Sequence, residues 1–188
     1  MPTGYQIKEQ NALHYVTLQV VYWVDVFTRK TYRDIVIESL RYCQKEKGLE
    51  IYAYAIMSNH VHLVIKSETN NLSDTLRDFK KFTSKKIIEE IEESTESRKN
   101  WMLRLFVHAA KRQNKKGTYQ IWTHENHAIQ LYSNSVIQEK VDYIHLNPVR
   151  SGIVVKPEDY LYSSARNYAE MESLLDIIQI TRLWKSYK

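Results

Sequence analysis

The sequence contains little cysteine, glycine or proline: one, four and three residues respectively of 188. The single cysteine, Cys43, excludes a disulfide framework and any zinc or iron–sulfur site built from several thiolates. No glycine belongs to a G-x-G-x-x-G or G-x-x-x-x-G-K pattern, which excludes the dinucleotide-binding and P-loop fingerprints. No apolar run approaches the roughly 18 residues of a membrane-spanning helix, and the first ten residues lack the pattern of a secretory signal. We therefore expect a cytoplasmic protein with no membrane partner.

Positive charge is concentrated in one part of the chain. The sequence has 27 Lys and Arg against 22 Asp and Glu, a formal net charge of +5. Residues 77–118 hold 12 basic and six acidic residues, so the rest of the chain is nearly neutral. A local basic surplus favours a polyanionic partner, nucleic acid before a membrane surface. The 43% hydrophobic content is that of a globular domain and excludes disorder as the main state.

Hydrophobic periodicity predicts alternating strands and helices. The expected strands, rich in β-branched and aromatic residues, cover residues 13–24, 49–57 and 60–66. The expected helices run from Thr31 to a stop at Gly48, from caps at residues 70–73 into a solvated acidic run at Glu89–Glu96, and from caps at residues 133–135 to Asn147-Pro148. The remaining segments are a helix or strand within residues 97–117, a strand within 122–131, a turn and short helix at 157–168, and a strand or docking helix in LLDIIQITRLW at 174–184.

The order β-α-β-β-α is the opening of a ferredoxin-like sandwich. We therefore predict an α+β fold, in which an antiparallel β-sheet carries helices on one face and leaves the other open to a ligand. One domain is expected over residues 1–168, followed by a C-terminal tail of unassigned role at residues 169–188.

The motif His60-Val61-His62 is the sharpest local feature. On a strand, residues two apart point to the same face, so both imidazoles stand side by side. Neutral imidazole is the commonest metal ligand, and two adjacent rings make half a site. The plainer alternative is two histidines on a half-exposed strand, each with a hydrogen-bond partner.

The segment VDYIHLNPVRSG, residues 141–152, is the second feature. Tyr143 and Asn147 are four residues apart and share a helix face, with Lys140 three residues before Tyr143. The plainer alternative is a packed tyrosine with its hydroxyl at the rim and an asparagine that ends the helix.

Together these motifs resemble the single-tyrosine HUH transposases of the insertion-sequence and REP-associated type, the IS200-like transposases. The resemblance lies in IMSNHVHLVI, YIHLNPVRSGIV and YSSARNY, which occur in the family's order. It covers about residues 15–168. It implies a ferredoxin-like HUH domain with the catalytic tyrosine on a later helix. The implied activity is metal-dependent cleavage and transfer of single-stranded DNA through a covalent 5′-phosphotyrosine intermediate, in transposition or REP-element mobilisation.

The resemblance assigns roles by position. His60 and His62 match the HUH metal ligands, and Tyr143 matches the nucleophile. Asn147 matches the third ligand, which is a glutamine in related insertion-sequence enzymes. The implied cofactor is Mg²⁺ or Mn²⁺, which would polarise a phosphoryl oxygen.

Two residues are candidates for a supporting role. Lys140 would lower the cost of a phenolate on Tyr143. His127, in WTHENHAIQL, would approach the site or the DNA, although we favour a structural or strand-packing role for it.

The implied partner is single-stranded DNA with hairpin ends. Insertion-sequence relatives form dimers and REP-associated ones act as monomers, so a homodimer is one of two oligomeric states that the resemblance allows. The basic residues offered for DNA contact are Lys80, Lys81, Lys85, Lys86, Lys111, Arg112, Lys115, Lys116 and Arg150.

Two other function classes compete with this reading. A two-histidine phosphoesterase usually needs two separate H-x-[ST] motifs, and this chain has one H-x-H. A non-catalytic nucleic-acid-binding ferredoxin-like domain would need neither a metal nor Tyr143. The formation of a covalent protein–DNA adduct separates the three classes.

Overall fold

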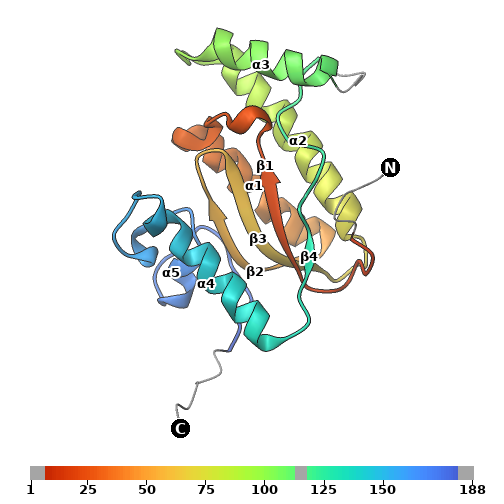
Figure 1. The fold of residues 1–188 in the computed structure, drawn as a ribbon, viewed down its shortest axis with the longest axis vertical. Coiled ribbons are helices and arrows are strands. Elements are labelled where there is room, and N and C mark those ends of the chain that lie inside the picture. Colours follow the sequence, from red (N-terminus) through yellow and green to blue (C-terminus); the bar gives the residue numbers. More distant parts are fainter. Residues whose placement is uncertain (1–6, 113–117, 182–188) are drawn as a thin grey trace.

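A four-stranded antiparallel sheet forms the centre of the molecule (Figure 1). The computed structural model describes residues 7–112 and 118–181. The sheet order is β2-β3-β1-β4, which is the strand order of a ferredoxin-like sandwich, so the predicted fold class is confirmed. The strands are β1 (His14–Gln19), β2 (Leu49–Ile56), β3 (His60–Ser67) and β4 (Ile129–Gln130).

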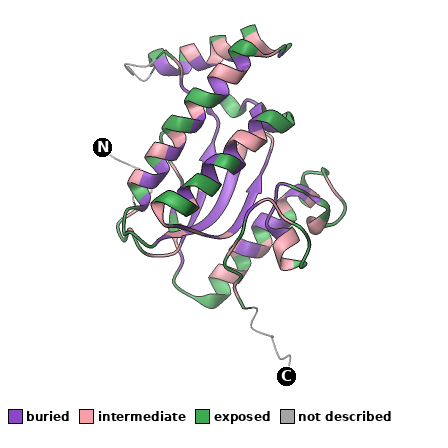
Figure 2. Ribbon diagram, turned by 180° about the vertical axis from the view of Figure 1, so that it is seen from behind, coloured by how far each residue is buried: buried purple, intermediate pink, exposed green. Residues whose placement is uncertain are grey.

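The two faces of the sheet have separate apolar cores. Along β3, Val61, Leu63 and Ile65 face one core, whereas His62 and Val64 face the other, as strand alternation requires. Helices α1 (Lys30–Lys47) and α2 (Leu72–Glu93) cover the first face, which Figure 2 shows from behind. Helix α4 (Asn134–Arg150) packs over part of the second face. The later helix therefore lies on the same side of the sheet as the histidine pair.

Helix α1 ends where the sequence predicts. Gly48 adopts the left-handed conformation at φ 61°, and its N–H donates to the carbonyl of Cys43. Glycine reaches this conformation without a steric penalty, which explains the stop. The buried Cys43 is a free thiol on the inner face of this helix.

The end of α4 corrects the sequence-based prediction. The helix continues through Pro148 to Arg150 instead of closing at Asn147-Pro148. Gly152, at φ 69°, provides the stop: its N–H donates to the carbonyl of Val149, and that of Ile153 donates to the carbonyl of Pro148. This is a Schellman arrangement, and it satisfies the last carbonyls although the proline lacks an N–H.

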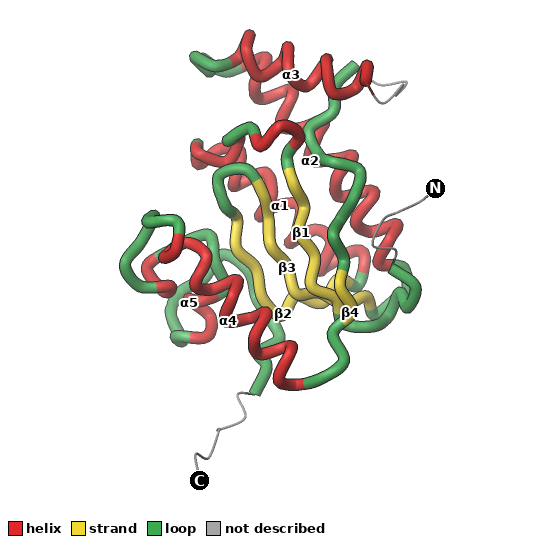
Figure 3. Tube along the Cα trace, viewed as in Figure 1, coloured by secondary structure: helices red, strands yellow, loops and turns green. Residues whose placement is uncertain are grey.

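Other segments are shorter or less regular than expected. The first strand ends at Gln19, and two 3-10 turns follow it, η1 (Val21–Trp23) and η2 (Val26–Thr28). Within residues 122–131 only the two residues of β4 are strand, although the segment runs beside β1 through further backbone hydrogen bonds (Figure 3). Either a helix or a strand was predicted within residues 97–117, and the structure has helix α3 (Lys99–Arg112) there. The predicted turn and short helix at 157–168 appear as η3 (Pro157–Asp159) and α5 (Ala165–Tyr168).

The described part of the tail, residues 169–181, is neither the strand nor the helix that its apolar pattern suggests. Leu175 is buried in the first core, and the N–H of Ile178 donates to the carbonyl of Ile51 on β2. Side chains from other elements satisfy further tail carbonyls, as Arg41 does for Leu174. Tertiary contacts thus replace a local hydrogen-bond pattern in residues 169–181. Residues 182–188 lie outside the described part. Within that part, no helix has the length and apolar character needed to cross a membrane.

Glu96 is a buried carboxylate and corrects the prediction of a solvated acidic run. It is 5% exposed and lies 3.0 Å from Arg29 Nε and 3.1 Å from Arg98 Nε. Burial alone would raise the pKa of this carboxyl, but hydrogen bonds from Arg98 and the charges of both arginines lower the pKa to about 2. The carboxylate therefore joins the start of α1 to the connection between α2 and α3.

Replacing this carboxylate should destabilise the fold. We expect Glu96→Gln to lower the free energy of unfolding by about 3 kcal/mol at pH 7, because two arginines lose their buried partner. The folded-state pKa lies below the ordinary value of 4.5, so this stabilisation is complete above pH 4.5 and is lost as the pH falls toward 2. Urea denaturation at several pH values measures it, with the exposed Glu93→Gln as matched control. A difference between wild type and Glu96→Gln that does not shrink at low pH would contradict the assignment.

Candidate active site

His60 and His62 stand side by side on β3. Their Nε2 atoms are 3.0 Å apart and their ring centroids 4.5 Å apart. The strand places both rings on the face that α4 partly covers, as the two-residue spacing predicts. Burial lowers the pKa of His60. Burial, followed by the neighbouring His60, lowers the pKa of His62 to about 3. Both rings are therefore neutral at pH 7, the state in which imidazole binds a metal.

The tautomer of His60 is set by Asn59. His60 Nδ1 lies 2.7 Å from Asn59 Oδ1. The same amide donates from Nδ2 to the carbonyl of Trp23 and to Asp25 Oδ1, which fixes its oxygen toward the histidine. Nδ1 of His60 must therefore carry the proton, and Nε2 presents a lone pair.

Two hydroxyls on the neighbouring strand hold His62. Its Nδ1 lies 2.9 Å from the Tyr15 hydroxyl and 3.1 Å from Thr17 Oγ1 on β1. Burial raises the pKa of Tyr15 to about 12, so this phenol stays protonated. Because a hydroxyl can donate or accept, the pair supports either tautomer of His62, including the one with a free Nε2 lone pair.

Asn147 completes a set of three donors. Its Nδ2 lies 3.0 Å from His62 Nε2. If His62 Nε2 carries a proton, this N–H faces the N–H of the Asn147 amide. If it carries none, its lone pair faces the lone pair of His60 Nε2. A 180° rotation of the amide would turn Oδ1 toward the rings, and amide orientation is an assignment. Three lone pairs would then converge, so the residues present fit a divalent cation.

This donor set depends on the amide. In the described ranges, residues 7–112 and 118–181, no group of three or more His, Cys, Asp or Glu side chains could hold a metal ion. Two imidazoles and one amide oxygen carry no charge, so a bound cation would keep its full charge for an anionic ligand such as a phosphate.

Tyr143 lies beside the histidine pair. Its ring centroid is 5.5 Å from that of His62 and 6.3 Å from that of Tyr15, both in edge-on contacts. The residue is 38% exposed and lines a surface cavity of about 670 Å³ along α4. The guanidinium of Arg150 lies 5.6 Å from its ring centroid. A solvent-accessible phenol, a cationic group and two neutral imidazoles thus occupy one face of one chain.

Packing and capping explain the position of α4. Val141 and Ile144 insert into the second core, and Ser133 caps the helix by accepting a hydrogen bond from the N–H of Val136. His145 is buried, with Nε2 2.8 Å from Ser164 Oγ, which also accepts from the N–H of Tyr54. Ser164, within the motif at 162–168, therefore links α4 to β2 through these two hydrogen bonds.

The two candidate supporting residues differ in position. Lys140 lies near the site, with Nζ 5.5 Å from the ring centroid of Tyr15 and 3.4 Å from Glu139 Oε1. His127 is exposed on the segment beside β1, with Nδ1 3.9 Å from Glu125 Oε2. Its side chain is 48% exposed, which does not fit strand packing, whereas a structural role stays a prediction.

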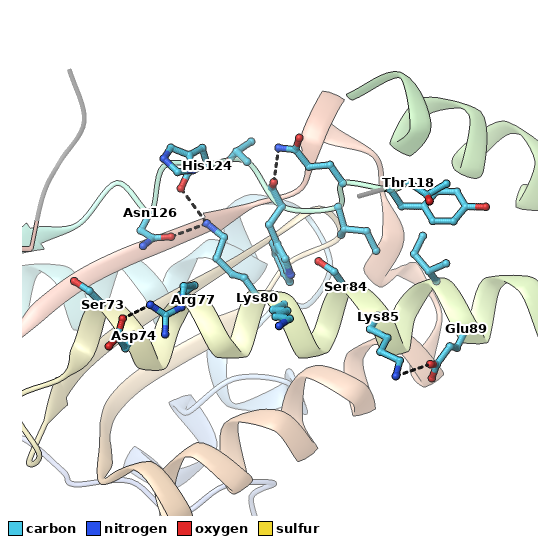
Figure 4. A pocket seen from close by; sticks show the side chains of 17 residues that line it. Ser73, Asp74, Arg77, Lys80, Ser84, Lys85, Glu89, Thr118, His124 and Asn126 are labelled. Carbon is cyan, nitrogen blue, oxygen red and sulfur yellow. Dashed lines mark hydrogen bonds and ion pairs between the residues drawn. The ribbon is translucent and has the colours of Figure 1, made fainter. Parts of the chain in front are cut away.

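The described basic residues offered for DNA contact are distributed over α2, α3 and α4. Figure 4 shows a pocket of about 790 Å³ between α2 and residues 118–126, lined by Arg77, Lys80, Lys81 and Lys85 among others. Within it, Lys80 donates to the carbonyl of His124 and to Asn126 Oδ1, which ties α2 to the segment beside β1. Lys86 follows Lys85 on α2 and pairs with Glu89 at 2.9 Å. Lys111 and Arg112 end α3, and Arg150 lies beside Tyr143 on α4. Lys115 and Lys116 lie outside the described residues.

The residues that orient the histidines were not among the predicted site residues. Tyr15 and Thr17 alternate on β1, and in the observed register Thr17 is opposite His62. The two-residue spacing of Tyr15 and Thr17 can be recognised in the sequence. Together with an assumed antiparallel pairing of β1 with β3, this spacing would have placed both hydroxyls on the histidine face. Asn59 is the immediate neighbour of His60, so adjacency alone could have suggested it.

The chain is similar to a known family and to solved structures. The model of the IS200-like transposase family matches residues 9–120, which include both histidines and exclude Tyr143 and Asn147. The chain is similar to a REP-associated tyrosine transposase solved bound to a REP hairpin, with TM-score 0.62 and 16% identity over 99% of this chain and 98% of that one. A transposase candidate from Deinococcus radiodurans R1 gives TM-score 0.41 and 16% identity over 77% and 95%. A search of curated proteins finds no match.

Proposed function

The chain belongs to the IS200-like transposase family, and from that premise we propose that it cleaves and rejoins single-stranded DNA through a covalent 5′-phosphotyrosine on Tyr143. The observation that carries the proposal is the contact between Tyr143 and His62, with ring centroids 5.5 Å apart. The same contact lies within one chain, which supports a site formed by the residues of one protomer. We therefore propose that a monomer acts in cis, with a homodimer as the alternative.

The cofactor that we propose is Mg²⁺ or Mn²⁺, held by His60, His62 and Asn147. When bound, such a cation would polarise a phosphoryl oxygen and stabilise the charge that develops in the transition state. The residues around the donors prepare the site for it. Asn59 orients His60, while Tyr15 and Thr17 orient His62.

The reaction is a transesterification, in which one phosphoester bond forms and one breaks. The Tyr143 oxygen attacks the scissile phosphorus, the new bond is Oη–P, and the bond to the 3′ oxygen breaks. The phenolic proton is lost as the Oη–P bond forms, and the leaving 3′ oxygen gains a proton and becomes a hydroxyl, so no net proton is consumed. Because a phenolate is a better leaving group than an alkoxide, a 3′ hydroxyl of another strand can reverse the step without an external energy source.

Positive charge near the phenol favours its attack. The Arg150 guanidinium lies 5.6 Å from the centroid of the Tyr143 ring, and Lys140 lies one helical turn before Tyr143. Both would stabilise a developing phenolate and the phosphate beside it. The solved relative is bound to a REP hairpin, and we propose hairpin-ended single-stranded DNA as the substrate class of this chain.

Adduct formation tests the proposal directly. The full chain is incubated with Mn²⁺ and a pool of single strands that carry a hairpin, with randomised stem and flanks and a separate label at each end. We expect the 3′ label to migrate with the protein on a denaturing gel, and a 5′-labelled fragment with a 3′ hydroxyl to be released. A protein that retains hairpins without any adduct would instead be the non-catalytic binding domain.

A further inference from the structure

The turn after β1 presents two aromatic side chains on an unusual backbone. Tyr22 and Trp23 adopt left-handed conformations, with φ 54° and 56°. They are 42% and 65% exposed. Bulky residues rarely adopt positive φ, since the conformation is strained, and such strain concentrates at functional sites. An exposed indole also gains little from burial, so folding alone gives no reason to keep Trp23 there.

The surrounding contacts fix this turn firmly in place. Val20, Val24 and Phe27 on either side are buried in the first core. The N–H of Trp23 donates to the carbonyl of Val20, and the amide of Asn59 donates to the carbonyl of Trp23. The indole is therefore displayed from a rigid support, which keeps the entropic cost of binding low.

The displayed indole lies at the histidine pair. The ring centroids of Trp23 and His60 are 6.3 Å apart at an interplanar angle of 77°. His60 contacts His62, and His62 contacts Tyr143, so the four rings form a continuous series of neighbours. Asn59 bonds both the Trp23 carbonyl and the His60 ring, which couples the turn to the site.

We propose that Trp23 stacks on the base next to the scissile phosphate and so positions the single strand at the histidine pair. This inference rests on the proposed function, because it assumes that DNA binds at this site. Every base has a π-face, so stacking on an aromatic side chain tolerates any sequence. The contact would hold one nucleotide out of a helical stack and align the neighbouring phosphate with the attacking phenol.

The test uses an oligonucleotide recovered from the adduct experiment, with 2-aminopurine at each position that flanks the cleaved bond. Binding is measured in a Tyr143→Phe background to prevent cleavage. We expect quenching of 2-aminopurine fluorescence at one flanking position, and Trp23→Ala should remove it and weaken binding about 10-fold. The dependence of log Kd on log salt should keep its slope, since no phosphate contact is lost. Trp23→Phe should restore most of the quenching.

Matched variants separate stacking from a structural role. Trp101→Ala removes another exposed tryptophan, on α3, and should leave affinity and quenching unchanged. Trp23→Gly relieves the left-handed strain and should not lower the melting temperature, although it abolishes the quenching. Unchanged affinity and quenching in Trp23→Ala would overturn this inference alone. Failure of the wild type to form any adduct would overturn the proposed function as well.

Discussion

Tyr143→Phe is expected to lower the yield of covalent protein–DNA adduct by more than about 10³-fold while leaving hairpin affinity within about twofold. The substitution removes only the attacking oxygen. The phenyl ring keeps its edge-on contacts with His62 and Tyr15, so the packing of α4 on the sheet is unchanged. Denaturing gels of the labelled oligonucleotide report the adduct, and fluorescence anisotropy reports the affinity.

A second phenol near His62 makes this result informative. Tyr15 lies 2.9 Å from His62 Nδ1, but it is 8% exposed and burial raises its pKa to about 12. Tyr143 is 38% exposed and faces a surface cavity. A strand of DNA can therefore reach Tyr143 more readily than Tyr15. An adduct that persists in Tyr143→Phe and disappears in Tyr15→Phe would reverse the assignment.

Tyr132→Phe provides the matched control for an exposed phenol. Tyr132 is 82% exposed and lies two residues before α4. Its replacement should leave the adduct yield unchanged, because the residue has none of the ring contacts that place Tyr143 at the histidines. Equal losses in both variants would point to a general effect on α4 instead of chemistry at Tyr143.

Local patterns predicted the elements that position the histidines. Period-two alternation placed His60 and His62 on one face of a strand, and Gly48 marked the end of the preceding helix. The four-residue spacing put Tyr143 and Asn147 on one helix face. The meeting of that helix with that strand came from the family resemblance, because spacing along one element does not determine which face of a sheet it covers.

Three features were missed or wrongly predicted from the local pattern. The acidic run looked solvated, yet Glu96 is buried and pairs with Arg29 at the start of α1 and with Arg98 two residues along the chain. Pro148 looked like a helix end, yet the hydrogen bonds of Gly152 and Ile153 move the end beyond it. The left-handed turn at Trp23 contains no glycine, so the sequence gives no sign of its positive φ angles. Contacts from distant segments set the first and the third of these outcomes, through Arg29 and Asn59. Local hydrogen bonds of Gly152 and Ile153 set the second.

Removing the proposed metal ligands should have the second large effect. We expect EDTA to eliminate adduct formation, and His62→Ala to reduce it by more than about 100-fold even with Mn²⁺ present. His62 is central among the three donors, since His60 Nε2 and Asn147 Nδ2 each lie 3.0 Å from its Nε2. Its loss would leave one imidazole and one amide, too few to bind a divalent cation well.

Thermal denaturation measures this cation binding without any DNA. A ligand that binds only the folded state stabilises it by about 2.7 kcal/mol at a concentration 100 times its Kd. Mn²⁺ should therefore raise the melting temperature of the wild type but not that of His62→Ala, whereas the exposed His124→Ala should respond like the wild type. A wild type whose melting temperature is insensitive to Mn²⁺ at millimolar concentration would mean that the converging lone pairs hold no cation before DNA arrives. The phosphate oxygens of the substrate would then have to complete the coordination, and only melting in the presence of both DNA and Mn²⁺ would show the shift.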